Sequence, residues 1–183
     1  MPLALSILIR RGCAAALALL LALSGHGAWA QQASEAAVKA GFVFNFIKFT
    51  QWPVGRGGVA APIRLCAPSD QPLEGQLSLL NGRNVGSRVI DVRTGVAPGE
   101  WRQCDVLFLG ESDAERLATL QPRLANAPVL TLGDLPGFVE AGGMIGLRVE
   151  ASRVRFDVNL NSAQLSGLVL NSQMLKLAGK VMQ

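Results

Sequence analysis

From residue 62 onward, short apolar stretches alternate with helical patterns along the chain. Ile63 to Ala67, Arg88 to Val92 and Pro128 to Leu132 have the length and composition of strands, and residues 73–80 those of a short helix. The stretch from Asp105 to Gly110 contains an unbroken apolar run, which is typical of a central strand covered on both faces. Strands that alternate with helices predict a single α/β domain, with a mostly parallel sheet and helices on both of its faces.

Two helix starts are predicted from their capping residues. Ser112 with Glu115 three residues later forms a capping box and should begin a helix after the central strand. Asn161 with Gln164 three residues later predicts a second start, for a C-terminal helix from about Ser162 to Val181. Leucines occupy two faces of that helix, so we expect it to be deeply buried or to contact another molecule.

After Gly142-Gly143, apolar and polar residues alternate with a period of two, which predicts an antiparallel hairpin with one core face. If Ala151-Ser152 is the turn, the apolar residues of the two arms pair on one face: Val149 with Val154, Leu147 with Phe156, and Ile145 with Val158. Ala-Ser is a poor two-residue turn, so a longer loop is the alternative.

The same pairing sets Arg148 directly opposite Arg155, and like charges in that position are destabilising unless they are neutralised. Glu150 and Asp157 lie within diagonal reach and can neutralise them. The functional alternative is an anionic ligand or an acidic partner surface at these arginines.

The N-terminal segment KAGFVFNFIKFTQWP has four phenylalanines between Phe42 and Phe49, and it predicts a helix ended near Pro53. Its charge-free run is far too short to span a bilayer. We expect most of the phenylalanines to lie in the core, and a partner to contact the end from Trp52 to Arg56.

The first 30 residues are predicted to be a cleaved signal peptide. Arg10-Arg11 precede an apolar run, and Ala28-Trp29-Ala30 offers a cleavage site. Removing 30 of 183 residues leaves 153, so residues 31–183 are expected to form one domain in an extracytoplasmic compartment.

The composition of this exported domain restricts its chemistry. The single His, His26, leaves with the signal peptide. Because serine and cysteine hydrolase triads and the usual zinc sites need histidine, these classes of site are excluded. Without Arg10 and Arg11, the 17 basic residues become 15 against 13 acidic ones, a net charge of +2 without long runs of one sign. Neither nucleic-acid binding nor a cofactor or metal is therefore expected.

Cys66 and Cys104 are the two cysteines left in the exported domain. In an oxidising compartment two cysteines favour one disulfide bond, and a free or redox-active pair is the alternative.

Two carboxylates follow predicted parallel strands, Glu111 after Leu109-Gly110 and Asp134 after Leu132-Gly133. Open α/β sheets place ligands at this edge, so an acid pair there is a hypothesis for an enzyme. First-turn acidic residues of ordinary helices are the competing interpretation.

Several motifs in order resemble the YfiR family of exported bacterial proteins. They are VKAGFVFNFIKFTQWP, IRLCAPSDQPL, CDVLFLGES, PVLTLGDLPGF and the long C-terminal block that runs from GGMIGLRVEASRVRFDVNL to LKLAGKV. Together these motifs extend over nearly all of the chain after the signal peptide.

The resemblance implies a non-enzymatic periplasmic repressor. Such proteins bind the periplasmic sensor domain of an inner-membrane diguanylate cyclase and hold it inactive, which lowers cyclic di-GMP and biofilm formation. An outer-membrane lipoprotein can sequester them, and a homodimer is a further expectation. Cys66 and Cys104 match family cysteines, whereas a second cysteine pair of some members is absent here.

The contact residues suggested for a partner or an anion are Trp52, Arg56, Arg148 and Arg155. The alternative function is a periplasmic sensor of small anions or nucleotides that has no cyclase partner.

Overall fold

The computed structural model describes residues 27–53, 61–68 and 72–183, so the predicted signal peptide up to residue 26 lies outside it. The chain divides into two units, Met1–Glu35 and Ala36–Gln183. The described part of the first unit is the beginning of helix α2 (Gly27–Lys48). The second unit is the α/β domain, and the following description concerns this unit.

An eight-stranded sheet forms the centre of the domain, in the order β10-β8-β7-β6-β5-β2-β4-β3. Its strands are β2 (Ile63–Ala67), β3 (Asn84–Val85), β4 (Arg88–Thr94), β5 (Val106–Leu109), β6 (Leu130–Gly133), β7 (Ile145–Glu150), β8 (Arg153–Asn159) and β10 (Val181–Met182). The pairs from β4 through β2, β5 and β6 to β7 are parallel, whereas β7–β8 and β3–β4 are antiparallel. This confirms the predicted mostly parallel sheet with a C-terminal antiparallel hairpin.

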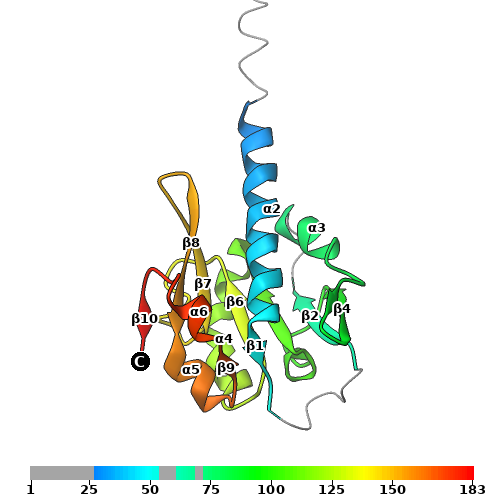
Figure 1. Cartoon of the computed structure of the whole chain (residues 1–183), viewed down its shortest axis with the longest axis vertical. Coiled ribbons are helices and arrows are strands. Elements are labelled where there is room, and N and C mark those ends of the chain that lie inside the picture. Colours follow the sequence, from blue (N-terminus) through cyan, green and yellow to red (C-terminus); the bar gives the residue numbers. More distant parts are fainter. Residues whose placement is uncertain (1–26, 54–60, 69–71) are drawn as a thin grey trace, which may run out of the picture. The chain divides into compact units, whose positions relative to one another are not determined.

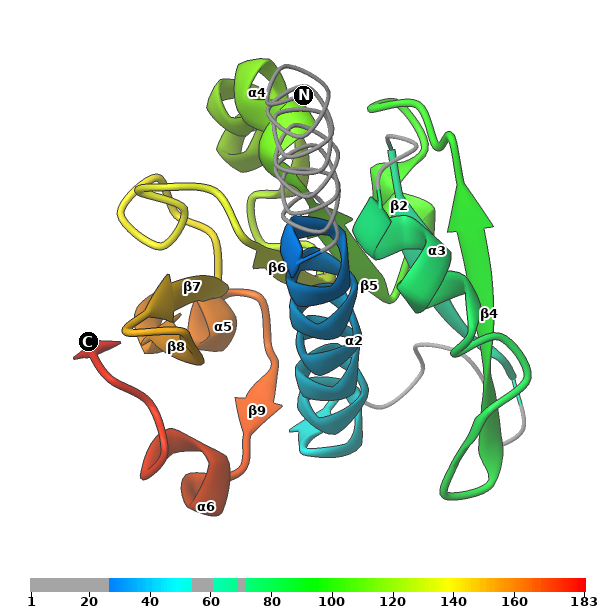
Figure 2. The same cartoon turned by 90° about the horizontal axis from the view of Figure 1, so that it is seen from above.

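Helices cover both faces of the sheet (Figures 1 and 2). Helix α2 from Ala36 onward and α3 (Pro72–Ser78) lie on one face, and α4 (Ala114–Leu124) lies on the other. The short 3₁₀ helices η1 (Trp101–Gln103) and η2 (Glu111–Asp113) precede β5 and α4. Helices α5 (Leu160–Leu165) and α6 (Ser172–Leu175) follow the hairpin, and a two-stranded ribbon pairs β1 (Thr50–Gln51) with β9 (Val169–Leu170).

The central strand β5 separates two apolar clusters, because successive side chains of a strand point to opposite faces. Val106 and Phe108 belong to the cluster on the α2 side, and Leu107 and Leu109 belong to the cluster on the α4 side. All four side chains are at most 2% exposed. The predicted burial of this strand on both faces is confirmed.

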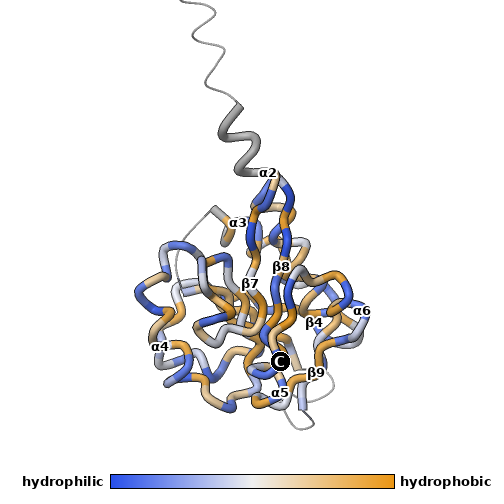
Figure 3. Tube along the Cα trace, turned by 90° about the vertical axis from the view of Figure 1, so that its left-hand side faces the viewer, coloured by the Kyte–Doolittle hydropathy of each residue, from blue (hydrophilic) through white to orange (hydrophobic). Residues whose placement is uncertain are grey.

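The hairpin has the predicted register, with Val149 opposite Val154, Leu147 opposite Phe156 and Ile145 opposite Val158. The alternation of hydrophilic and hydrophobic residues along it can be followed in Figure 3. The loop has two residues, and both adopt left-handed conformations, with φ 48° at Ala151 and 60° at Ser152. This is the geometry of a type I′ turn, which suits the twist of a hairpin although neither residue favours it.

Phe156 on the core face of the hairpin contacts helix α2. Its ring centroid lies 4.9 Å from that of Phe46 and 5.8 Å from that of Phe42. Phe46 is buried and Phe42 half-buried, whereas Phe49 at the end of the segment is 37% exposed. Phe44, like Phe42, is partly buried and packs against the core, so only Phe46 lies fully in the core. The expectation that most of these phenylalanines lie in the core is therefore met only in part.

The predicted C-terminal helix from Ser162 to Val181 is wrong, because the chain leaves the helix after one and a half turns. Gly167 has φ 72°, its amide donates to the carbonyl of Gln164, and the amide of Leu168 donates to that of Ala163. These two bonds form a Schellman motif, which ends a helix at a glycine. Of the leucines assigned to one helix, Leu165 therefore lies in α5, Leu170 in β9 and Leu175 in α6, and the others lie in the connections.

Both predicted caps are corrected. The amide of Ser162 donates to the side chain of Asn159, so Asn159 caps α5 in place of Asn161. At the other start, the side chain of Asp113 accepts from the amide of Gly110, and no side-chain cap from Ser112 forms. The first helix was expected to end near Pro53, and it ends at Lys48. The residues that follow form β1, and the Thr50 hydroxyl donates to the carbonyl of Phe46 in the last turn of the helix.

Candidate functional site

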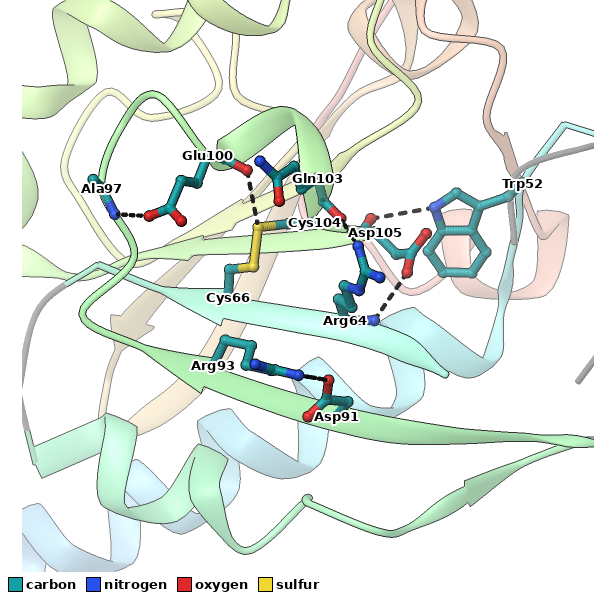
Figure 4. The surroundings of a disulfide bond; sticks show 10 residues. All are labelled: Trp52, Arg64, Cys66, Asp91, Arg93, Ala97, Glu100, Gln103, Cys104 and Asp105. Atoms are coloured by element: carbon teal, nitrogen blue, oxygen red, sulfur yellow. Dashed lines mark hydrogen bonds and ion pairs between the residues drawn. A yellow bond between two sulfur atoms is a disulfide. The ribbon is translucent and has the colours of Figure 1, made fainter. Parts of the chain in front are cut away.

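The disulfide bond joins Cys66 on β2 to Cys104 just before β5, as the sequence predicted (Figure 4). The cysteines are 2% and 1% exposed and belong to the apolar cluster on the α4 side, together with Trp101. A polar hollow of about 410 Å³ lies beside them, and its walls include Arg64 and Arg93. The bond ties the segment that contains η1 onto the sheet, which is a structural role.

Trp52 is anchored on the start of β5. Its indole Nε1 donates to the carbonyl of Asp105 at 3.2 Å, and the guanidinium of Arg88 lies 6.0 Å from the ring centroid (Figure 4 shows the indole bond). Arg88 and Asp105 also pair at 3.7 Å between Nη2 and Oδ2. Trp52 is half-buried in this position. Arg56, its predicted neighbour, lies outside the described residues.

The outer face of the hairpin carries a charged cluster. Arg148 lies opposite Arg155, as predicted, and its guanidinium contacts Asp157 at 3.0 Å and also Glu150. Hydrogen bonding to Glu150 and then to Asp157 raises the pKa of Arg148, and the bond from Arg148 lowers the pKa of Glu150. The two acidic residues therefore offset the charge of Arg148.

Arg155 differs from Arg148 in its surroundings. Its side chain is exposed and makes no hydrogen bond or close ion pair within the part of the chain that the structure describes, but its charge contributes to the lowered pKa of Glu150. The hairpin projects beyond its neighbours, because β6 pairs only with Ile145 and Gly146, and β10 only with Val158 and Asn159. Arg155 is thus a solvated cation on an exposed ribbon, where an anionic group can reach it.

The structure does not bring Glu111 and Asp134 together as an acid pair. Asp134 forms an ion pair with Lys39 of α2, with 2.9 Å between Oδ2 and Nζ, and the two side chains are only 8% and 11% exposed. Glu111 is exposed in η2. Asp134 therefore fastens α2 to the carboxyl end of β6, and its charge is already offset.

Sequence reasoning missed Lys39 as the partner of Asp134. A signal was present, since Lys39 interrupts an otherwise apolar surface of the first helix. A lysine in that position is buried only when its charge is paired.

Exposed apolar side chains concentrate in the last 20 residues of the chain. Leu165, Val169 and Leu177 are 64%, 60% and 74% exposed, and Val181 is 37% exposed. Leu79, far from this segment in the sequence, is exposed to a similar extent, at 69%.

Within residues 27–53, 61–68 and 72–183, none of the helices is long and apolar enough to cross a membrane. Those residues also contain no group of three acidic, cysteine or histidine side chains that could hold a metal ion.

Among solved structures, the chain is similar to a conserved domain protein from Vibrio cholerae O1 biovar El Tor. The TM-score is 0.56 at 9% identity, over 80% of this chain and 60% of that one. A second structure, an ABC domain in complex with L-Trp from Streptococcus pneumoniae, has a TM-score of 0.46 at 11% identity, over 65% of this chain and 56% of that one. The chain thus spans about 60% of the length of the Vibrio protein, with which it shares the fold.

A family model described as YfiR/HmsC-like matches residues 36–179. These boundaries include the described part of the α/β domain from α2 to the end of α6. The ordered motifs of the sequence, from the first helix to the C-terminal block, fall within the same range except for the last two residues of that block, Lys180 and Val181. The chain belongs to the YfiR/HmsC-like family.

Proposed function

We propose that this protein is a non-enzymatic regulator that binds the periplasmic sensor domain of an inner-membrane diguanylate cyclase and holds the cyclase inactive. The observation that carries the proposal is the family match over residues 36–179. Loss of the protein would raise cyclic di-GMP and favour biofilm formation.

A periplasmic location is part of the proposal. The disulfide bond between Cys66 and Cys104 supports it, because such bonds persist in oxidising compartments. The leader of residues 1–30, with its Arg-Arg pair and A-x-A site, would direct the export.

Repression needs only a difference in affinity between two states of the target. A ligand that binds the inactive state more tightly shifts the population toward that state, by as much as the affinities differ. To reverse the ratio of the two states from 1:99 to 99:1, the ligand must bind the favoured state about 10⁴-fold more tightly than the other state. A rigid domain with one docking surface is sufficient for this task, and no chemistry on a substrate is required.

Two regions are proposed to contact the cyclase. The first is the end of the N-terminal segment, with the half-buried Trp52 and with Arg56. The second is the hairpin. The charge of Arg148 is offset there by Asp157, whereas the exposed Arg155 offers a solvated cation to an acidic surface. We further propose that an outer-membrane lipoprotein sequesters the protein and that it forms a homodimer when unbound.

The test is direct binding of the purified protein to the purified periplasmic domain of a membrane-bound diguanylate cyclase from the same bacterium. We expect Arg155→Glu to weaken this binding by about tenfold, mainly through slower association and more strongly at low salt. The matched control is Arg123→Glu on α4, which has the same charge change on another exposed arginine. Equal affinities for the original protein and for both variants would remove the hairpin from the interface, and no binding at all would contradict the proposed function.

An anion sensor without a cyclase partner is the second candidate, and the solvated Arg155 is the observation that favours it. A ligand at 100 times its dissociation constant stabilises the folded state by about 2.7 kcal/mol. A thermal-shift screen with nucleotides and organic acids should then detect it, and Arg155→Ala should abolish the shift. An unchanged shift in that variant would exclude this site.

A further inference from the structure

A hollow of about 260 Å³ opens between the C-terminal half of α4, strand β6 and helix α5. Its floor is apolar and consists of Leu120 and Leu124 of α4 and Met144, which precedes β7. These three side chains are 1%, 6% and 4% exposed, so the hollow reaches down to the core of the domain. None of the residues proposed above for partner contact lines it.

One wall of the hollow carries polar side chains that have no partner within the described part of the protein. The hydroxyl groups of Ser162 and Ser166 make no hydrogen bond among the described residues, and neither does the side chain of Asn126 at the end of α4. Ser166 is nevertheless only 8% exposed. Ser166 is one of the residues that line the hollow, and its hydroxyl has no partner among the described residues with which a bound molecule would compete.

Gln121 and Gly142, which also line the hollow, are held together by a hydrogen bond. Gln121 donates from Nε2 to the carbonyl of Gly142 at 2.8 Å, and Gly142 has φ 93°. A side chain at residue 142 would overlap Gln121, because its Cβ would lie 1.8 Å from the Gln121 amide nitrogen. The contact holds the loop before β7 against α4.

No charged residue lines the hollow among the residues described. A carboxylate or an ammonium group bound there would lose its water without gaining an opposite charge, which is costly. At the mouth, Leu165 is 64% exposed and offers further apolar surface. The walls therefore select against ions and favour a molecule that is apolar on one side and hydrogen-bonding on the other.

We propose that this hollow is a binding site for a small uncharged molecule that has one apolar ring and one or two hydrogen-bonding groups. The volume lies just below the about 300–1,000 Å³ of pockets that take drug-sized ligands, which fits a single ring. An aromatic ring on the floor would contact the thioether of Met144, a favourable pairing. The polar group of the ligand would face Ser162, Ser166 and Asn126.

The site can be observed through the methionine methyl groups. The chain has four methionines, Met1, Met144, Met174 and Met182, and only Met144 lines the hollow. In protein labelled with ¹³C at the methionine methyls, titration with 4-methylphenol should shift the Met144 signal, with a Kd of roughly 1 mM as expected for eight non-hydrogen atoms. The signals of Met174 and Met182 should stay in place. Benzoate, of similar size but charged, should bind at least tenfold more weakly.

Two variants and a matched control test the assignment. Ser166→Leu fills the hollow and should weaken 4-methylphenol binding at least tenfold, whereas Ser172→Leu, the same change on α6, should leave it within twofold. Asn126 has a left-handed backbone with φ 58°, which glycine also adopts, so Asn126→Gly removes one polar group without straining the backbone. This variant should weaken binding about threefold. It provides the test if Ser166→Leu does not fold.

Four results would overturn the proposal. The first is equal movement of the Met174 and Met144 signals. The second is binding that neither Ser166→Leu nor Asn126→Gly changes. The third is benzoate binding as tight as that of 4-methylphenol. Absence of any Met144 shift at saturating 4-methylphenol would refute it as well.

Discussion

Removal of the disulfide bond should destabilise the domain by about 4 kcal/mol. Cys66 and Cys104 are 38 residues apart, and the chain-entropy model assigns about that much to the closure of such a loop. The alanine double variant Cys66→Ala/Cys104→Ala also removes two sulfur atoms from the cluster around Trp101, which is itself 0% exposed. Typical domains are stable by only about 5–15 kcal/mol, so the variant would lose a large share of its stability.

Urea unfolding followed by tryptophan fluorescence measures this loss. For a domain of this size, 1 kcal/mol corresponds to about 2–4 °C in Tm, so the variant should melt roughly 8–16 °C lower than the original protein. Its slope of free energy against urea should rise, because the unfolded chain without the cross-link exposes more surface. A reducing agent should lower the stability of the original protein and leave that of the variant unchanged.

A loss below about 1 kcal/mol would refute the loop-closure reasoning, provided that the original protein contains the bond. Mass analysis under non-reducing conditions establishes that point, and we expect no free thiol at Cys66 or Cys104. Two thiols that react with an alkylating agent in the native protein would contradict the disulfide itself.

Three further substitutions probe single features of the fold. Ser152→Gly relieves a left-handed residue in the hairpin turn and should raise the free energy of unfolding by about 1 kcal/mol, visible as a higher Tm. Gly143→Ala places a methyl group 2.2 Å from the ring of Phe138, and the overpacking should cost about 1–3 kcal/mol in urea unfolding. Lys39→Met leaves the buried carboxylate of Asp134 without its cation and should cost about 3–5 kcal/mol, whereas Lys39→Met/Asp134→Leu should recover part of the loss.

The sheet could be predicted from the sequence because its strands follow local rules. The unbroken apolar run of β5 matches a strand buried on both faces, and the period of two in β7 and β8 determined their register to the residue. A shift by one position would have turned Phe156 away from α2, so the core itself enforces the pattern.

The C-terminal segment could not be predicted from spacing, because its leucines fit a helix and also fit three short elements. Gly167 was the deciding residue, and its role as a helix terminator was readable but was outweighed by the leucine pattern. The cap at Asn159 was hidden for a different reason, since this residue also ends strand β8.

Some features of the candidate sites could be predicted from the sequence, and others could not. The opposition of Arg148 and Arg155 followed from the register, and the pairing of Cys66 with Cys104 followed from the count of cysteines in an exported domain. The pair of Lys39 with Asp134 joins α2 to the end of β6 across 95 residues, and the hollow arises where α4 meets α5. Such features depend on how elements pack together, which residue spacing does not encode.

The proposed repression of a diguanylate cyclase can be measured in cells through the level of cyclic di-GMP. The measurement compares four strains: the original bacterium, a deletion of this gene, a deletion of the partner cyclase gene, and a deletion of both. We predict that loss of this protein raises cyclic di-GMP only while the cyclase is present. An unchanged level in the single deletion, in cells that express both proteins, would contradict the account.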